Sequence, residues 1–345
     1  MNFSNSLLQW YLQNKRDLPW RNTTNPYPIW LSEIMLQQTR VSQGMPYFLK
    51  FVENFPTVFD LAHATEEQVL KLWQGLGYYS RARNMHKTAQ IIAFEYNGIF
   101  PNNYQNLLKL KGIGEYTAAA IASFAFNEVV PVVDGNVFRV LARYFDIETD
   151  IASSGAKKEF TSLAQELIPA NNPALFNQAI MEFGALQCVP KNPDCNNCIF
   201  NNSCLALKFK KVSELPIKIK KTKVLNRYLN YLIMLDSENK TVIQKRIDKG
   251  IWQNLYEFPV IELLKDENFD TIVSEIKTVL KSNNVENIIL FNEKIIIHKL
   301  SHQKLYIRFY EVKVSTLNST GTSLETLKKY PFPIVIHNFI EKYLN

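Results

Sequence analysis

All four cysteines of this 345-residue chain lie between Cys188 and Cys204, with the spacing Cys188-x6-Cys195-x2-Cys198-x5-Cys204. Four thiolates in so short a loop can close around one zinc ion or around an iron–sulfur cubane, and the ligands alone do not choose between them. Cysteines gathered in one loop are not the scattered set that a disulfide framework needs. The chain therefore has to fold this loop into a closed shape, and a metal site is predicted there.

The spacing of apolar residues changes beyond this loop. Up to about residue 187, apolar residues recur at helical spacing, as in PIWLSEIMLQQT and ALFNQAIMEFGAL, which predicts an all-α domain. After residue 226, alternating β-branched and aromatic runs such as RYLNYLIML and KLYIRFYEVKV are interleaved with helical patterns near 269–281 and 333–343. The second part is therefore predicted to be an α+β domain.

A lysine-rich stretch separates the helical pattern from the mixed pattern. The net charge of +7 is concentrated in residues 205–225, which carry seven lysines and one glutamate. Such a charge run is more often a solvated linker than a binding site, so charge makes only a modest case for nucleic acid. We expect a helical catalytic domain at 1–204 with its metal loop at 188–204, a connector at 205–226 and an α+β domain at 227–345.

The sequence predicts neither a membrane span nor an export signal. No apolar run is long enough to span a bilayer, and the amino terminus MNFSNSLLQWYLQNKRD lacks the apolar stretch of a signal peptide. We therefore expect a cytoplasmic protein that does not bind membranes.

Two glycines one residue apart, Gly112 and Gly114, separate two helical segments. A hairpin of this kind exposes backbone N–H groups at the start of the next helix, where the helix dipole favours a phosphate. An ordinary helix-turn-helix would explain a bare pair of glycines equally well. With the following Tyr116-Thr117-Ala-Ala-Ala, however, the stretch resembles the helix-hairpin-helix of base-excision DNA glycosylases.

Glu33 lies within a strongly apolar helical pattern. If a helix starts after Pro28, the side chains three and four residues from Glu33 include Trp30 and Leu36. A carboxyl group on such a face is hard to ionise, which suits a general acid near neutral pH. A solvated glutamate at the edge of the apolar stripe is the alternative.

Asp134 follows an apolar run and precedes a helical pattern that begins with Gly135-Asn136-Val137. The position predicts an N-cap, which is the commoner role of such an aspartate. N–H donors and the helix dipole are expected to keep this carboxylate ionised. Glu33 and Asp134 would then be shifted in opposite directions, as in other carboxylate pairs that cleave glycosidic bonds.

These motifs together resemble the adenine DNA glycosylases of the endonuclease III superfamily. The cysteine spacing is similar to that of the superfamily's cluster loop, which implies a [4Fe-4S] cluster on Cys188, Cys195, Cys198 and Cys204. The segment from Glu33 to Thr39 resembles the catalytic-glutamate helix, and Asp134-Gly-Asn-Val resembles the catalytic-aspartate motif. The resemblance implies that Glu33 and Asp134 are catalytic and that Tyr116 and Asn136 hold them in place.

Two features distinguish the subtype within that superfamily. Glycosylase-lyases carry a lysine in the hairpin where this chain has Tyr116, so a monofunctional enzyme is implied. The segment Gly250–Pro259 resembles the Nudix-like domain of adenine glycosylases, but the glutamates and arginine that bind metal in Nudix hydrolases do not follow it. Pyrophosphate hydrolysis is therefore not expected, and the resemblance implies that this domain reads the opposite base. Ser301 and His302 match the turn that contacts oxidised guanine, with Leu300 in place of the family's phenylalanine.

Further residues match family positions that contact DNA. Gln38 and Tyr78 correspond to residues that wedge into the duplex, although helix-end and core packing would also account for them. The remaining matches are to the adenine pocket: Trp20, Arg21 and Leu36.

The resemblance therefore implies a monomeric bacterial enzyme of the cytoplasm, working at the nucleoid. Its expected substrate is double-stranded DNA with adenine opposite 8-oxoguanine or guanine. A pyrimidine-specific glycosylase-lyase is one rival, which Tyr116 and the extra domain oppose. A non-catalytic DNA-binding protein, which would bind without releasing a base, is the other.

Overall fold

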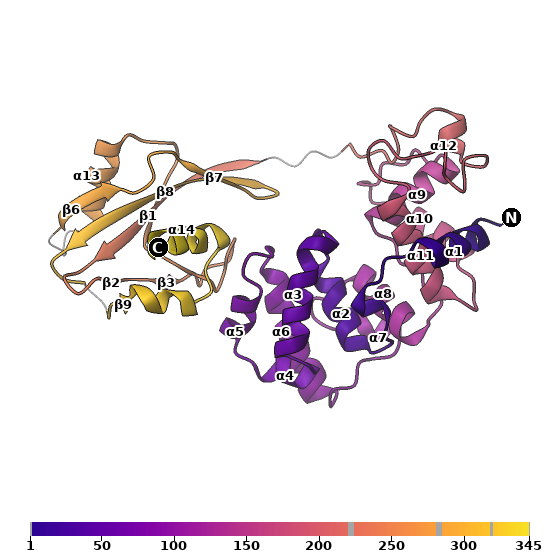
Figure 1. The fold of residues 1–345 in the computed structure, drawn as a ribbon, viewed down its shortest axis with the longest axis horizontal. Coiled ribbons are helices and arrows are strands. Elements are labelled where there is room, and N and C mark those ends of the chain that lie inside the picture. The colour runs from indigo at the N-terminus through magenta and orange to yellow at the C-terminus, as the bar shows by residue number, and fades with distance from the viewer. Residues whose placement is uncertain (1, 220–223, 281–284, 318–319, 345) are drawn as a thin grey trace. The chain divides into compact units, whose positions relative to one another are not determined.

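The first part of the chain folds into helices (Figure 1). Apolar side chains at helical spacing drive this, because burying them against neighbouring helices removes them from water. The computed structural model describes residues 2–219, 224–280, 285–317 and 320–344. The helices before residue 209 are α1 (Phe3–Asn14), η1 (Pro19–Arg21), α2 (Pro26–Met35), α3 (Val41–Asn54), α4 (Val58–His63), α5 (Glu66–Leu72), α6 (Ser80–Glu95), α7 (Tyr104–Leu107), α8 (Glu115–Phe126), α9 (Gly135–Phe145), α10 (Ala156–Leu167), α11 (Pro173–Leu186) and α12 (Leu205–Lys208).

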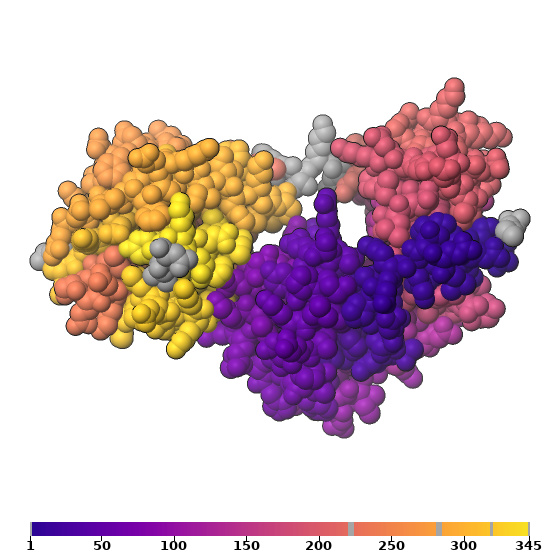
Figure 2. All heavy atoms as spheres, viewed as in Figure 1, coloured from indigo at the N-terminus to yellow at the C-terminus, as the bar shows by residue number. Residues whose placement is uncertain are grey.

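Helix α11 lies at the centre of one helical core, against α1 and α9. Its Phe176 and Phe183 are buried, and Trp10 of α1 meets Phe183 edge-on at 4.9 Å. Phe3 of α1 stacks on Phe200 of the cysteine loop, also at 4.9 Å. The amino-terminal helix and the cysteine loop thus pack together although about 190 residues separate them, as Figure 2 shows in indigo and rose.

Part of the predicted connector is folded rather than solvated. Ala206 and Leu215 are buried in the core formed by α1, α9, α10 and α11. The Arg143 guanidinium donates a hydrogen bond from Nε to the carbonyl of Leu215. Residues 205–215 therefore pack on the helical unit, while residues 220–223 of the predicted connector lie outside the described residues.

The second part of the chain is built on a mixed sheet. Its strands pair in the order β5-β1-β8-β6, with β7 also on β8; β1 and β8 run parallel and the other pairs are antiparallel. Its elements are β1 (Leu225–Leu235), β2 (Lys240–Thr241), β3 (Gln244–Lys245), β4 (Tyr256–Glu257), β5 (Val260–Leu263), α13 (Phe269–Val279), β6 (Val285–Leu290), β7 (Ile296–Lys299), β8 (Gln303–Val314), β9 (Thr322–Ser323), η2 (Leu324–Lys329) and α14 (Ile334–Leu344).

Helices cover both faces of this sheet, which explains why the last seven residues of β1 are all buried. On one face, Ile272 and Ile276 of α13 pack with Met234 and Val312 of the central strands. On the other, Phe339 of α14 stacks on Phe309 at 3.9 Å. The prediction of an all-α domain followed by an α+β domain is confirmed; the helix predicted at 269–281 ends at Val279, and residue 281 lies outside the described residues.

Two compact units emerge from the contacts within the chain. One contains Met1–His63 and Asn84–Lys220, and the other contains Ala64–Arg83 and Lys221–Asn345. Segment 64–83 belongs to the second unit through bonds such as that from the Tyr256 hydroxyl to the Glu67 carboxylate, 2.7 Å. The predicted domain boundaries stay a prediction. Within the described residues, no helix combines the length and apolar character needed to cross a bilayer.

Candidate active site

A cavity of about 850 Å³ opens within the helical unit, between α2, α8, α11 and the start of α9. It is large enough for a nucleoside, since ligand pockets commonly measure a few hundred Å³ or more. The structure brings seven predicted site residues, far apart in sequence, onto its wall: Trp20, Arg21, Glu33, Leu36, Tyr116, Asp134 and Asn136.

Glu33 is buried on the apolar face of α2, as its sequence neighbours predict. Its side chain lies near fully buried Trp30, and the residue as a whole is 7% exposed. The helix begins earlier than predicted, at Pro26, because Asn25 caps it and two prolines are tolerated in the first turn. Burial raises the pKa of Glu33 to about 7, against an opposing hydrogen bond from Tyr116. The carboxyl group can therefore hold a proton near neutral pH.

Tyr116 lies on the first turn of α8 and points its hydroxyl at Glu33. The hydroxyl donates a hydrogen bond to Glu33 Oε2 at 2.8 Å. Burial, together with the nearby carboxylates, raises the pKa of Tyr116 well above its usual range. Tyr116 is therefore a permanent hydrogen-bond donor that fixes the orientation of the Glu33 carboxyl group.

Asp134 caps α9, as predicted. Its Oδ1 accepts hydrogen bonds from the backbone N–H groups of Asn136 and Val137, each 2.8 Å, and Oδ2 accepts one from Asn136 Nδ2 at 2.7 Å. Asn136 is held in turn by Arg139, whose guanidinium donates to Asn136 Oδ1. The cap and the side-chain amide thus fix both oxygens of the carboxylate.

The prediction that the helix cap lowers the pKa of Asp134 and keeps it ionised is wrong in direction. Burial raises the pKa of this carboxyl group and outweighs the hydrogen bonds from Val137 and Asn136, which lower it. Asp134 and Glu33 are therefore shifted in the same direction, not in opposite directions. The two carboxyl groups differ in their hydrogen bonds: Asp134 accepts three N–H bonds, whereas Glu33 accepts a hydrogen bond from the Tyr116 hydroxyl.

Part of the cavity lining is apolar. Trp20, on the short helix η1, is buried and packs edge-on against Phe48 at 4.9 Å. Leu36 ends α2 and turns its side chain toward Gly44, where an added Cβ would lie 2.8 Å away from it. A flat ligand entering here would meet hydrophobic surface beside the two carboxyl groups.

The four cysteines also share one cavity, lined by Cys188, Cys195, Cys198 and Cys204. Arg143 of α9 crosses behind it, donating to Cys188 Sγ at 3.4 Å and to the carbonyls of Val189 and Pro190. Within the described part of the chain, no three His, Cys, Asp or Glu side chains lie close enough together to share one metal ion.

The two glycines of the hairpin have different reasons to be glycine. Gly112 has φ +76°, and an added Cβ would lie 2.7 Å from that of Asn84, so both backbone conformation and close packing exclude a side chain. Gly114 is the N-cap of α8 and makes no side-chain cap, and an added Cβ would meet nothing within 4 Å. The first turn of α8 is therefore left without a capping side chain, as a phosphate-binding helix end requires.

Comparison with known proteins places this geometry in a family. Residues 31–168 match the HhH-GPD superfamily of base excision DNA repair proteins, and residues 230–342 match the NUDIX domain. The adenine DNA glycosylase of Buchnera aphidicola subsp. Schizaphis graminum is 38% identical over 329 residues, covering 94% of this chain and 91% of that protein. The chain belongs to the adenine DNA glycosylase family.

Solved structures of other DNA glycosylases resemble 60% of this chain. A thermostable thymine-DNA glycosylase is 29% identical, with a TM-score of 0.56 over 60% of this chain and 95% of that one. A trapped endonuclease III–DNA covalent intermediate is 22% identical, with a TM-score of 0.53 over 60% of this chain and 94% of that one. The resemblance to the endonuclease III structure, at this low identity, shows that the two proteins share a fold.

The predicted wedge residues of the glycosylase both adopt left-handed backbone conformations. Gln38 has φ +54° and Tyr78 has φ +49°, and both side chains are exposed. Such conformations are uncommon outside glycine and gather at functional sites. Arg81 lies over the Tyr78 ring at 5.4 Å and donates to the Gly77 carbonyl, which supports the turn from beneath.

Ser301 and His302 lie in the turn between β7 and β8, as predicted. Both are exposed, and Ser301 Oγ lies 3.3 Å from His302 Nδ1. The Leu300 N–H donates to the Gln303 carbonyl and closes the turn. Two polar groups are thus presented at the tip of a hairpin anchored on the central strand β8.

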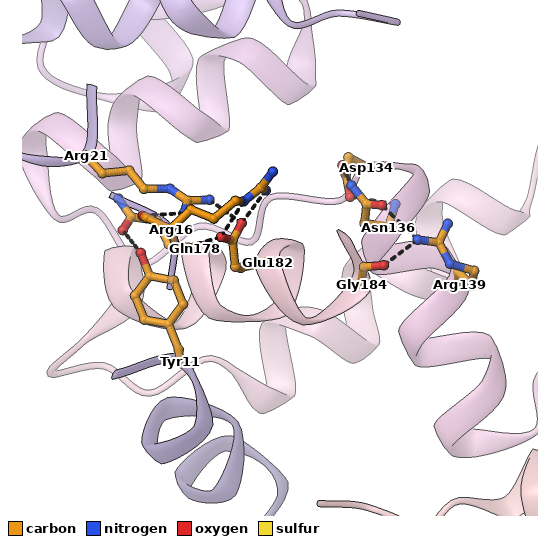
Figure 3. Close-up of polar contacts among 9 residues, drawn as sticks. All are labelled: Tyr11, Arg16, Arg21, Asp134, Asn136, Arg139, Gln178, Glu182 and Gly184. Carbon is orange, nitrogen blue, oxygen red and sulfur yellow. Dashed lines mark hydrogen bonds and ion pairs between the residues drawn. The ribbon is translucent and has the colours of Figure 1, made fainter. Parts of the chain in front are cut away.

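Four cavity residues of the glycosylase were missed by sequence reasoning: Arg16, Arg139, Gln178 and Glu182. Figure 3 shows Glu182 of α11 beside Arg16 and Arg21, and Asn136 joined to Arg139. Glu182 did carry a signal, because it is the only charged residue in the apolar helix PALFNQAIMEFGAL. A lone carboxylate on a buried face needs a partner, and that partner could have been sought among the arginines.

Proposed function

We propose that this chain is a monofunctional DNA glycosylase that removes adenine mispaired with 8-oxoguanine or guanine in duplex DNA, as a monomer in the bacterial cytoplasm. The observation that carries the proposal is that one cavity is lined both by a carboxyl group with a pKa of about 7 and by an aspartate that caps a helix. The names of its relatives support adenine as the base.

The reaction begins with an adenosine turned out of the duplex, because its glycosidic bond is out of reach in the base stack. Glu33, protonated near neutral pH, donates its proton to adenine N7 as the bond between the sugar C1′ and the base N9 breaks. The bonding electrons leave with the base, which departs neutral, and the sugar becomes cationic. Tyr116 keeps the Glu33 oxygens aimed at the base.

Asp134 stabilises the positive charge that develops on the sugar, held in place by its cap bonds and by Asn136. Glu33 is now ionised and takes a proton from a water molecule, whose oxygen bonds to C1′. The products are free adenine and an abasic site. The proton given up at the start is recovered, so the enzyme ends as it began.

A lyase step has no nucleophile in this cavity. Tyr116 occupies the hairpin position of the lyase amine, and no lysine is among the described residues that line the pocket. Without a primary amine no Schiff base can form, and the strand is left intact. Borohydride trapping with substrate DNA should therefore yield no covalent complex.

The cysteine loop suits a [4Fe-4S] cluster. In a zinc site four sulfurs crowd around one ion, whereas in a cubane each thiolate binds its own iron and the sulfurs stand further apart. The four thiols line one cavity, and their spacing along the chain resembles that of the superfamily's cluster loop, which supports the second arrangement. When bound, the fully ligated cluster supplies a structural brace for the loop, and Arg143 ties that loop to the catalytic helix α9.

We expect purified protein to be brown, with a broad visible absorbance and about four irons per chain, because thiolate-ligated clusters absorb in the visible range. Cys198→Ser should lose that absorbance, while substitution of the exposed Ser203, which lies in the same loop, should keep it. A colourless protein with one zinc per chain would show that the cluster assignment is wrong.

The DNA contacts are proposed from exposed groups on each unit. Gly112 and Gly114 would present N–H groups to a phosphate, and Gln38 and Tyr78 would enter the duplex where the adenine leaves. Ser301 and His302 would read the edge of the opposite base. The test of the whole proposal is adenine release from duplexes with A opposite 8-oxoguanine, guanine or cytosine.

Truncation after Ile219 should leave adenine cleavage in place and remove most of the preference for 8-oxoguanine over guanine. The reason is that every residue assigned to bond cleavage precedes Cys188, whereas Ser301 and His302 lie in the second part of the chain. In the full chain, Ser301→Ala with His302→Ala should act similarly, since each lost hydrogen bond costs about 1–3 kcal/mol of discrimination. Dependence on these groups should be strong because Leu300 replaces an aromatic residue.

The measurement is the ratio of single-turnover rates on A:8-oxoguanine and A:guanine duplexes. Ser315→Ala, at an exposed position just after β8, serves as the matched control and should leave the ratio unchanged. If truncation does not alter the ratio, the opposite base is recognised by the helical part.

A further inference from the structure

Glu182 is the most completely enclosed carboxylate of the cavity wall. It projects from the middle of α11, its side chain is 0% exposed, and it is bonded through both oxygens. Oε1 accepts from the backbone N–H and Nε of Arg16, and Oε2 accepts from a terminal nitrogen of Arg16 at 2.6 Å and of Arg21 at 2.8 Å. One buried anion thus binds two guanidinium groups.

The anion is firmly ionised in this setting. Burial alone would raise the pKa of Glu182, but the hydrogen bonds from Arg16 and Arg21, with the nearby charge of Arg21, lower it to about 2. A buried ion pair repays its desolvation only when its geometry is good, and here four N–H donors surround the carboxylate. The cluster is therefore a fixed feature of the cavity at any pH where the enzyme works.

The cluster lines the cavity that also holds Glu33 and Asp134. Arg16, Arg21 and Glu182 line the same cavity as Glu33 (Figure 3 shows the three together). The groups that act electrostatically on Glu33 are Tyr116 from α8, Asp134 at the start of α9 and Arg21 from η1. Arg21 favours the ionised form of Glu33, which is the form that cannot donate a proton.

We propose that Glu182 is a positioning residue for excision: it fixes Arg16 and Arg21 in the cavity wall and balances their charge, so that Glu33 can keep its proton until the base arrives. With Glu182 ionised, the three-residue cluster carries one net positive charge. With Glu182 neutral it would carry two, with no carboxylate left in the cluster to balance them. The proposal rests on the proposed function, in which Glu33 is the acid.

The sharpest variant is Glu182→Gln, which keeps the side-chain shape and one acceptor oxygen but removes the charge. We expect the pKa of Glu33 to fall by about one unit or more, as happens to a carboxyl beside an unbalanced guanidinium. The basic limb of the pH profile of adenine release should move from near pH 7 to about one unit lower. Relative to wild type, the rate of adenine release by Glu182→Gln should therefore be reduced about tenfold more at pH 8 than at pH 5.5.

Arg21→Met provides the opposite change. It removes the charge that favours ionised Glu33, so the basic limb should move to higher pH, whatever happens to the maximal rate. Combining Glu182→Gln with Arg21→Met should return the limb toward that of wild type. Opposite shifts with mutual compensation are not expected from a residue that only supports the fold, since loss of packing lowers the rate equally at every pH.

Glu166→Gln is the matched control, because Glu166 is an exposed carboxylate on α10 and lies outside the cavity lining. It should leave the limb in place. Thermal unfolding followed by circular dichroism checks that each variant is folded. If Glu182→Gln does not fold, Arg21→Met alone decides: an upward shift supports the charge balance, and an unmoved limb overturns it.

A second readout does not depend on activity. Titration of the Glu33 carboxyl by carbon-13 NMR, assigned by comparison with Glu33→Gln, should show the same downward and upward shifts in the DNA-free protein. Unchanged titration in both variants would overturn the inference while leaving adenine release intact. Absence of adenine release in wild type, with the shifts still present, would instead overturn the proposed function alone.

Discussion

Glu33→Gln should lower the single-turnover rate of adenine release by about 10²–10⁴-fold, the range that a general acid contributes, while binding of the mispaired duplex is kept. The substitution deletes the proton donor but preserves the shape of the side chain. Its amide oxygen can still accept the hydrogen bond from the Tyr116 hydroxyl. The measurement is adenine release from an A:8-oxoguanine duplex under single turnover, with binding followed by a mobility shift.

A stability measurement separates lost chemistry from lost folding. The pKa of Glu33 is about 7 in the folded protein and near 4.5 when the chain is unfolded, so ionisation favours unfolding, and wild type loses stability as pH rises from about 4.5 through 7. Glu33→Gln removes this penalty and should raise the free energy of unfolding at pH 8 by about 2–3 kcal/mol. Release within tenfold of wild type would contradict the assignment of Glu33 as the acid.

The parts of the site that could be predicted from sequence are those encoded locally. Glu33 was predicted to be hard to ionise because the residues one turn away, Trp30 among them, are apolar, and helix geometry alone puts them around it. Asp134 was predicted to cap a helix because the residues after it form one. Ser301 and His302 were placed in a turn because strand-like runs flank them.

Long-range pairing could not be predicted in the same way. Nothing near Glu182 in the sequence indicates that Arg16 and Arg21 bind it, because about 160 residues separate the partners and only the packing of α11 brings them together. The folding of part of the connector could not be predicted for the same reason. The lysines of the connector suggest solvent exposure, yet Leu215 is buried and the distant Arg143 donates a hydrogen bond to the Leu215 carbonyl. Local charge is a poor guide where a few apolar residues anchor a segment.

The direction of the Asp134 titration shows where local reasoning fails on energetics. The cap bonds were predicted correctly, and taken alone they would favour the anion. Burial acts in the other direction and is larger, and it depends on a cavity wall assembled from several distant helices. A capping carboxylate is therefore not by itself evidence of an ionised one.

Asp134→Asn should lower the rate of adenine release by about 10²–10³-fold, the range seen for single electrostatic groups in other active sites, because the amide cannot carry the negative charge that the proposed mechanism places beside the cationic sugar. The amide oxygen of Asn can still accept from the Asn136 and Val137 N–H groups, so α9 should keep its cap. The hydrogen bond from Asn136 Nδ2 to Oδ2 is lost, because the Asn amide nitrogen cannot accept it, and its loss should cost about 1 kcal/mol of unfolding free energy.

Asp134→Ser and Asp134→Ala divide the two roles of this residue. Serine can cap a helix but carries no charge, so it should be as inactive as Asn and remain stable. Alanine should also be inactive and should lose about 1 kcal/mol of unfolding free energy with the cap. The measurements are single-turnover release and thermal unfolding on the three variants. If Asp134→Ser retains release within tenfold of wild type, Asp134 is a cap only, and the cationic sugar must be stabilised by Glu33 after it has given up its proton.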